Sequence, residues 1–403
     1  MNLSDDISKI KEEYQKFKNS KKLLDLTRGR PSSEQLDLSD NLETVMKGDF
    51  IQDKVDTRNY GLLEGLPSAR KLAGWVLNSD PKNILVNGTS SLTLLGHYLH
   101  SMIFHGDGQV AWKDLDKVTF LCPVPGYDRH FAMLEKLGIK MIPVPLEGDG
   151  PDLDSIENLL ETDESIKGMI CVPKHSNPTG EIFSREKIEA LASINKDGFK
   201  IILDNAYAVH DFDDSKKLPD IEKIFIDKNS HDSLIMLGST SKISLAGSGL
   251  AFISLSPKNM ENFVNYFSKF SLGSDKVNQA RHTRIFNSKK ALTEHMQKLA
   301  KIIKPKFDLV QEKLHELPDG LAKWTRPTGG YFVSFDSLNG NASKIHKLCE
   351  EAGLKLTPLG ATFPYGKDLE NKNIRIAPTQ VELKELSEAM DLFCICVLLA
   401  EES

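Results

Sequence analysis

Residues 233–255 of the 403-residue chain read SLIMLGSTSKISLAGSGLAFISL. Two apolar runs flank a loop of small residues, and the loop contains one lysine, Lys242. Small neighbours allow a bulky ligand to lie directly against the backbone. A lysine in such a loop is a candidate for imine chemistry, provided that burial or a nearby cation lowers the pKa of its amine from about 10.4. A surface lysine in a polar turn has the same local sequence, so the rest of the chain must separate the two interpretations.

Short apolar runs typical of buried strands recur from residue 84 onward. Segments of helical length separate most of them, which predicts crossover connections and a mostly parallel sheet covered by helices on both faces. The seven runs are 84–86, 118–122, 141–144, 169–172, 201–204, 234–237 and 250–255. The predicted fold class is therefore α/β with a seven-stranded sheet.

The C-terminal part of the chain predicts a second, smaller α+β unit. A long helical pattern over residues 289–314 leads away from the sheet, and an amphipathic helix over 381–398 closes the chain. Strands are expected between these helices, at 331–335 and 374–376. We expect a large domain, residues 50–300, and a small domain formed by residues 1–49 and 301–403.

Composition indicates an ordinary soluble protein. The formal net charge is 51 − 57 = −6 without a basic block, so neither a nucleic acid nor an anionic membrane is an expected partner. Five cysteines, mostly within apolar runs, are typical of reduced core residues and not of a disulfide framework. No signal peptide or membrane-spanning run is visible, and no metal site is predicted. We therefore expect a cytoplasmic protein.

Polar residues with possible chemical roles follow two of the predicted strands. Asp204 ends the run 201–204, and a carboxylate at the carboxyl end of a parallel strand faces the usual ligand crevice. A helix N-cap is an equally good interpretation of Asp204, and core packing is one for Tyr207, three residues later. Asn177 lies in the turn NPTG after another strand, which alone is weak evidence.

Two further loops suggest a phosphate site and an aromatic cover. After the run 84–86, a turn rich in Gly, Ser and Thr leads into a helix, whose N-terminus offers free N–H groups to a phosphate. The turn contains Gly88, Thr89 and Ser90, and it lacks the Gly-Lys-Ser/Thr of a P-loop. Tyr127, in CPVPGYDRH, is placed where its ring could cover a flat ligand or pack in the core.

Taken in order, these loops resemble the class I/II aminotransferases of fold type I, which use pyridoxal 5′-phosphate (PLP). The resemblance extends from LTRGRP to NIRIAP, nearly the whole chain. The wording TRGRPSSEQLDLS, CPVPGYDRHF and DKVNQARH is most similar to the divergent bacterial aspartate aminotransferase subgroup.

The resemblance implies catalytic roles for Lys242, Asp204 and Tyr207. Lys242 would bind PLP as an imine and shuttle a proton, and Asp204 would pair with the pyridine nitrogen and keep it protonated. Asn177 and Tyr207 would hydrogen-bond the phenolic oxygen of the cofactor, and Asn177 would also face the substrate. Tyr127 would stack on the cofactor ring.

The resemblance also implies residues for the phosphate and for a second subunit. The phosphate would be held by Gly88, Thr89, Ser90 and Ser239. Tyr60, in NYGLLEGLPSAR, matches a tyrosine that reaches the phosphate of the other subunit, which implies a homodimer with shared sites. Many relatives carry a phosphate-binding arginine eight residues after the lysine, but this chain has Gly249 or Leu250 there. Arg281 and Arg284 are candidate replacements.

Substrate residues follow from the same resemblance. Arg375, in NIRIAP, would clamp the substrate α-carboxylate, because a planar guanidinium suits two-pronged binding. Gly29 would approach the substrate. Because Arg375 can bind only one carboxylate, a dicarboxylate substrate needs a second cation, and Arg28 and Arg30, which flank Gly29, are the candidates. A solvated turn is the other interpretation of these two arginines.

These implied roles predict an aminotransferase with a ping-pong mechanism. Aspartate or glutamate is the expected amino donor, and 2-oxoglutarate the acceptor. A lyase or decarboxylase reaction on the same fold remains an alternative, because the cofactor supplies the electron sink and side chains only steer. An effector-binding domain of a transcriptional regulator is another.

Overall fold

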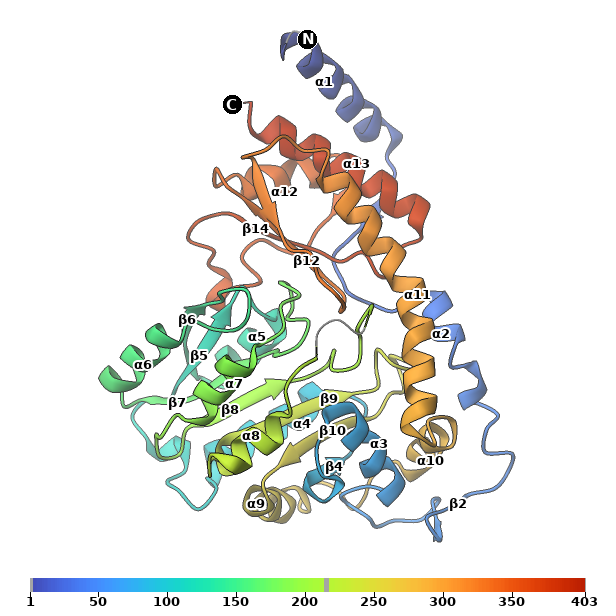
Figure 1. Cartoon of the computed structure of the whole chain (residues 1–403), viewed down its shortest axis with the longest axis vertical. Coiled ribbons are helices and arrows are strands. Elements are labelled where there is room, and N and C mark those ends of the chain that lie inside the picture. Colours follow the sequence, from blue (N-terminus) through green and yellow to red (C-terminus); the bar gives the residue numbers. More distant parts are fainter. Residues whose placement is uncertain (1–2, 214–216, 403) are drawn as a thin grey trace.

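The computed structural model describes residues 3–213 and 217–402. Within these residues a seven-stranded sheet has the order β4-β10-β9-β8-β7-β5-β6 (Figure 1). Its strands are β4 (Ile84–Val86), β5 (Thr119–Val124), β6 (Lys140–Pro145), β7 (Ile166–Cys171), β8 (Lys200–Asp204), β9 (Leu234–Ser239) and β10 (Ala251–Leu255). Strand β10 is antiparallel to both of its neighbours, and the pairs from β9 to β6 are parallel. The predicted α/β class and the predicted strand runs are confirmed.

The sheet is buried on both faces because its strands are apolar throughout. Alternate residues serve opposite faces, so Leu203 and Met236 join one hydrophobic cluster while Ile202 and Ile235 join the other. The first face is covered by α3 (Pro67–Leu77), α7 (Arg185–Ala192), α8 (Ile221–Asp227) and α10 (Lys276–Ile285). The second is covered by α4 (Ser91–Phe104), α5 (Asp128–Lys136) and α9 (Pro257–Phe267). Helix α6 (Leu153–Thr162) packs beside α7.

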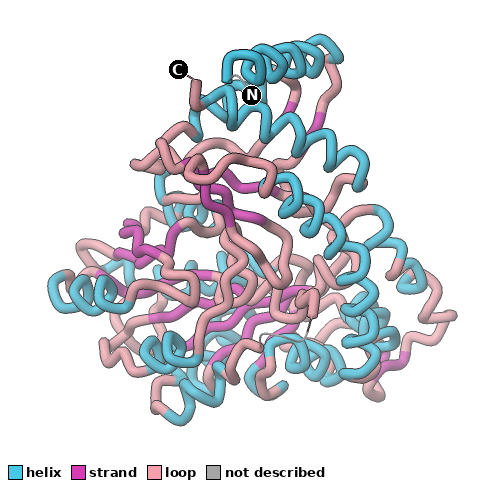
Figure 2. Tube along the Cα trace, turned by 45° about the horizontal axis from the view of Figure 1, so that its top comes forward, coloured by secondary structure: helices cyan, strands magenta, loops and turns pink. Residues whose placement is uncertain are grey.

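The chain leaves the sheet along the 26-residue helix α11 (Lys289–Leu314) and builds a second unit around three antiparallel strands, described in the order β11-β12-β14 (Figures 1 and 2). Its elements are β11 (Ala322–Trp324), β12 (Val333–Ser337), α12 (Ala342–Glu351), β13 (Leu354–Lys355), β14 (Asn373–Ile376) and α13 (Leu383–Ala400). The long helix, both predicted strands and the closing helix are present, with ends shifted by a few residues.

The N-terminal segment packs on this second unit. Helix α1 (Leu3–Ser20) lies against α13, and Tyr14 donates a hydrogen bond to the carbonyl of Leu348 over 3.0 Å. Strand β1 (Leu24–Asp25) pairs in parallel with β13. The chain then returns to the sheet through the short elements α2 (Ser33–Asp37), β2 (Ile51–Gln52) and β3 (Val55–Asp56). The division at residues 49 and 300 stays a prediction.

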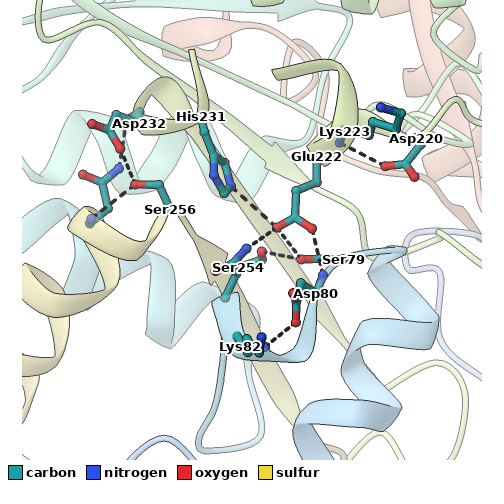
Figure 3. A network of polar contacts seen from close by, with 12 residues as sticks. Ser79, Asp80, Lys82, Asp220, Glu222, Lys223, His231, Asp232, Ser254 and Ser256 are labelled. Atoms are coloured by element: carbon teal, nitrogen blue, oxygen red, sulfur yellow. Dashed lines mark hydrogen bonds and ion pairs between the residues drawn. The ribbon is translucent and has the colours of Figure 1, made fainter. Parts of the chain in front are cut away.

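A buried carboxylate fastens α8 to the turn that precedes β4 (Figure 3). Glu222 accepts hydrogen bonds from the Ser79 hydroxyl at 2.9 Å, the Asp80 backbone N–H at 2.7 Å and the Asn83 side-chain amide at 2.9 Å. Burial raises the pKa of Glu222, but hydrogen bonds, that from His231 among them, outweigh burial and hold the pKa below its usual value. The network fixes one edge of the sheet.

All five cysteines are buried and unpaired. Among the described helices, none is both long and apolar enough to cross a membrane.

Candidate active site

A cavity of about 670 Å³ lies between the carboxyl ends of the parallel strands and the second unit. Residues from distant parts of the sequence line it, including Gly29, Tyr127, Asn177, Tyr207, Lys242, Phe332 and Arg375. A larger neighbouring cavity of about 960 Å³ shares Arg28 and Arg30 but contains neither Lys242 nor Asn177. The smaller cavity is therefore the candidate active site, because ligands of open α/β sheets bind in the crevice at the carboxyl ends of the strands.

Lys242 presents its amine to this cavity from the loop between β9 and β10. Its Nζ lies 4.8 Å from the centroid of the Tyr207 ring. Burial lowers the pKa of Lys242, and the nearby Asp204 carboxylate opposes part of that effect. A lowered pKa raises the fraction of free amine, which is the nucleophilic form, and the small-residue loop alone could not show this shift.

Three buried histidines hold the loop that carries Lys242. The His210 Nε2–H donates to the Lys242 carbonyl over 3.1 Å, and the His295 Nε2–H donates to the Ile243 carbonyl over 2.6 Å. His282 lies with its Nε2 2.8 Å from the Ser244 hydroxyl, while its Nδ1–H donates to the Asn278 carbonyl. Burial lowers the pKa of all three, to about 3 for His210 and about 4 for His282, so they are neutral at pH 7. Sequence reasoning missed these residues.

Asp204 stands at the end of β8 with a side chain that is almost fully buried. Its Oδ2 accepts a hydrogen bond from His130 Nε2 over 3.0 Å. Its Oδ1 has no hydrogen-bond partner among the described residues. The segment after β8 is a turn and no hydrogen bond to the carboxylate from a backbone N–H is present in the described chain, so the structure does not support the N-cap interpretation. A buried oxygen without a partner is costly unless a ligand supplies a donor.

Tyr207, Tyr127 and Asn177 surround the same space. Tyr207 is buried, and burial raises its pKa well above the usual value. Burial also raises the pKa of Tyr127, whose ring meets the His130 ring edge-on at 4.8 Å between centroids. Asn177 is 1% exposed and precedes a cis proline. The structure therefore brings together all five residues expected around a cofactor ring.

Arg375 enters the cavity from β14 and is already paired. Its Nη1 donates to Asp128 Oδ1 at 2.8 Å and to Asn177 Oδ1 at 3.2 Å, and its Nε donates to the Thr357 hydroxyl at 3.2 Å. The guanidinium carbon lies 4.8 Å from the centroid of the Phe332 ring. The ion pair with Asp128 was not predicted, because Asp128 lies 247 positions away in sequence.

The expected phosphate residues lie on two adjacent loops. Gly88 has a φ of +68°, which suits glycine, and Ser90 is the N-cap of α4. Ser241 donates to the Thr89 carbonyl over 3.1 Å, which ties this turn to the lysine loop. Ser239 is the last residue of β9 and is buried. The turn and the end of β9 thus face one region near Lys242.

The two candidate arginines for the phosphate differ in their surroundings. Arg284 donates to the carbonyls of Met46 and Ile51 and forms an ion pair with Asp49. The buried Nε of Arg281, by contrast, has no partner in the described chain. Arg281 lies on α10 between Asn278, which donates to the Ser248 carbonyl, and His282. The structure therefore favours Arg281.

Positive charge dominates the rest of the cavity. Gly29 lies against Phe332, since a Cβ added to Gly29 would come within 2.5 Å of the ring. Arg28, Arg30 and Arg129 line the cavity with Lys242, Lys355 and Arg375, while Asp128 and Glu350 are its carboxylates. Arg129 was not singled out from the sequence, although it follows Tyr127 by two residues.

Tyr60 lies outside the cavity of its own chain. Its side chain is 81% exposed, next to Leu272, which is 73% exposed. The two segments are joined by a hydrogen bond from the Gly61 N–H to the Leu272 carbonyl at 3.2 Å. Tyr60 therefore does not line the candidate active site of its own chain.

The residues present fit PLP. The unpartnered Asp204 Oδ1 can accept from a protonated pyridine nitrogen, Lys242 offers an amine, and the Gly88–Ser90 turn leads into a helix N-terminus suited to phosphate. Fold and site together define a PLP-dependent enzyme of fold type I.

Comparisons with known proteins place the chain within that class. The family model described as aspartate amino-transferase matches residues 1–403, and the chain belongs to this family. It is 39% identical over 400 residues to the aspartate aminotransferase of Corynebacterium glutamicum, with 97% of this chain and 92% of that protein covered. The crystal structure of an aspartate transaminase from the same organism superposes with a TM-score of 0.94 at 38% identity, covering 98% of this chain and 95% of that one.

A more distant relative shows the fold alone. The α-aminoadipate aminotransferase LysN of Thermus thermophilus, solved with a phosphopyridoxyl-leucine adduct, superposes with a TM-score of 0.78 at 19% identity, covering 97% of this chain and 95% of that one. The family and the C. glutamicum relative establish an aminotransferase, a class of enzyme that acts on amino acids and 2-oxo acids.

Proposed function

We propose that this enzyme transfers the amino group of aspartate or glutamate to a 2-oxo acid such as 2-oxoglutarate, by a ping-pong mechanism. The observation that carries the proposal is the cationic cavity around Lys242. Arg375 lies on one wall, and Arg28, Arg30 and Arg129 line the same space. A dicarboxylate has two charges to pair, and a desolvated carboxylate–arginine pair is among the stronger charged contacts. The aspartate aminotransferase of C. glutamicum supports the same substrate class.

The residues of this chain then have the following tasks. Lys242 would hold PLP through its side-chain amine and, once free, would move the proton to and from the substrate α-carbon. When bound, PLP supplies the electron sink for the electron pair that remains on the substrate α-carbon after the proton leaves. Asp204, held by His130, keeps the ring nitrogen protonated, and Tyr207 with Asn177 donates to the phenolic oxygen.

Substrate binding is assigned to the arginines. Arg375 takes the α-carboxylate, and Arg28 or Arg30, beside Gly29, takes the distal carboxylate. A hydrophobic amino acid would place its side chain among these cations without compensation. Lyase or decarboxylase chemistry remains the second candidate, but the family and the relatives favour transfer.

The experiment compares aspartate, alanine and phenylalanine in wild type, Arg28→Ala and Arg30→Ala. We expect wild type to prefer aspartate, and one variant to lose about 2–5 kcal/mol of transition-state stabilisation for aspartate only. Lys355→Ala, which removes another cation of the cavity, is the matched control and should affect the three donors alike. Equal turnover of phenylalanine and aspartate by the wild type would contradict the proposal.

A further inference from the structure

The ion pair between Asp128 and Arg375 bears on how any substrate can bind. Arg375 has five N–H donors, and the described residues use three of them. Thr357 accepts from Nε, while Asp128 and Asn177 accept from Nη1, so only Nη2 is not engaged in the described chain. A carboxylate bound side-on needs two adjacent donors, on Nη1 and Nη2 or on Nε and one of these. An incoming α-carboxylate can therefore bind with both oxygens only if one present acceptor leaves.

Burial indicates which acceptor can leave. Thr357 is 6% exposed and Asn177 is 1% exposed, so both side chains are largely enclosed although they line the cavity. The Asp128 side chain is 29% exposed and opens to the cavity. Asp128 is also the one acceptor among these three that carries a charge. Its carboxylate pairs with the Arg375 guanidinium in the same way as a substrate carboxylate would.

The N-terminus of helix α5 can stabilise the Asp128 carboxylate after it leaves Arg375. It is the first residue of the nine-residue helix α5, directly after the N-cap Tyr127. Backbone N–H groups and the positive end of the helix dipole stabilise a carboxylate in the first turn. Arg129, which follows in sequence, lines the same cavity. A released Asp128 side chain thus remains beside positive charge.

We propose that Asp128 is an internal carboxylate that competes with substrate for Arg375. Substrate binding then exchanges one carboxylate for another, so the net gain at Arg375 is small. The remaining affinity must come from the distal part of the substrate, which fits a cavity that Arg28 and Arg30 also line. This inference rests on the proposed function, in which Arg375 binds the α-carboxylate.

The test uses Asp128→Asn in the PLP-loaded enzyme, because Asn keeps the size and removes the competing charge. We expect the KM for aspartate and for 2-oxoglutarate to fall about tenfold without an increase in kcat, as the loss of a charge-assisted contact implies. The Kd of maleate, a dicarboxylate that cannot react, should fall by the same factor in an equilibrium titration. Asp128→Ser should behave alike and serves if the Asn variant folds poorly.

The matched control is Glu350→Gln, which removes the other carboxylate of the cavity without touching Arg375. Its KM values and its maleate Kd should change by less than about threefold, because general charge effects in a wet cavity are screened. A fall equal to that of Asp128→Asn would show a nonspecific charge effect and overturn the proposal. An unchanged or raised maleate Kd in both Asp128 variants would also overturn it.

Arg375→Ala separates this proposal from the proposed function. If that variant loses aspartate and maleate binding while Asp128→Asn leaves both unchanged, competition by Asp128 is wrong and the role of Arg375 stands. If Arg375→Ala binds maleate as the wild type does, both proposals fall.

Discussion

At Gly249 the backbone of the lysine loop packs against itself. A Cβ at this position would lie 2.8 Å from the Ser241 backbone nitrogen and 2.9 Å from its Cα, so a larger residue would displace the main chain. The loop therefore requires glycine at this position, and it could not accept an arginine there without moving its backbone. The charge for the cofactor phosphate must come from another element.

Arg281 is the residue we expect to supply that charge. A buried phosphate dianion needs a cation or many donors, and the Nε of Arg281 is buried without a partner in the described residues. Arg281→Ala should lower the affinity of the apoenzyme for PLP about tenfold or more, measured by equilibrium titration. Arg284→Ala is the control, since Arg284 is already bound to Asp49 and Ile51, and its PLP affinity should stay near that of the wild type. Unchanged affinity in Arg281→Ala would leave neutral donors and the helix dipole to hold the phosphate.

The sequence predicted individual site residues where a local pattern fixes their position in the fold. Lys242, Asp204 and Asn177 were predicted because each follows a recognisable apolar strand, and the strands fixed their place at one edge of the sheet. Their roles stay proposals. Asp128 and Arg129 were passed over, although they follow Tyr127 directly, because nothing in the local sequence shows that β14 brings Arg375 beside them.

At the scale of elements, the lysine loop is held by neutral histidines from helices α10 and α11 and from the segment after β8. Their contacts span 32 residues for His210, 38 for His282 and 52 for His295, so no local pattern could indicate them. A buried histidine with a lowered pKa must take up a proton on unfolding at acidic pH, so the loop depends on pH.

The sign of that dependence follows from linkage. Because the folded-state pKa of His210 is about 3 and that of His282 about 4, their contribution to stability is complete above an unfolded pKa of about 6.5 and is lost as pH falls below it. As the pH falls below about 6.5, the uptake of a proton by each unfolded histidine lowers the free energy of unfolding by up to about 1.4 kcal/mol per pH unit.

Urea unfolding of the His210→Gln variant between pH 7.5 and pH 5 measures this effect. The variant should be less stable at pH 7.5, and its stability should fall less steeply than that of the wild type, by about 2 kcal/mol over the range. His105→Gln, at an exposed position outside the lysine loop, is the control for replacing a histidine as such. Parallel slopes for His210→Gln and wild type would contradict a neutral, buried His210.

At the scale of the whole molecule, we expect the surface around Tyr60 to meet a second copy of the chain. Tyr60, Leu272 and Phe270 are 81%, 73% and 59% exposed, an apolar patch that water alone covers poorly. If Tyr60 reaches the phosphate of a partner subunit, as the resemblance implies, it need not line the cavity of its own chain. Contacts between subunits cannot be predicted from a single sequence, and here only the family resemblance suggested one.

Mixed dimers test this arrangement. Lys242→Ala and Tyr60→Phe, refolded together, should recover up to about a quarter of wild-type activity, because a mixed dimer contains one site with both native residues. Lys242→Ala mixed with Asp204→Ala should recover none, since both groups come from the same subunit. Failure of the first pair to recover, or a monomer in sedimentation at micromolar concentration, would exclude shared sites.

The most direct measurement concerns Lys242 itself. Borohydride reduction of the PLP-loaded enzyme, followed by peptide mapping, fixes the cofactor to whichever lysine carries it. The pyridoxyl group should lie on the peptide containing Lys242, and prior addition of aspartate should prevent the labelling. A label on any other lysine, or a label on Lys242 that aspartate leaves unchanged, would contradict the assignment of this loop as the cofactor-bearing centre of an aspartate-type aminotransferase.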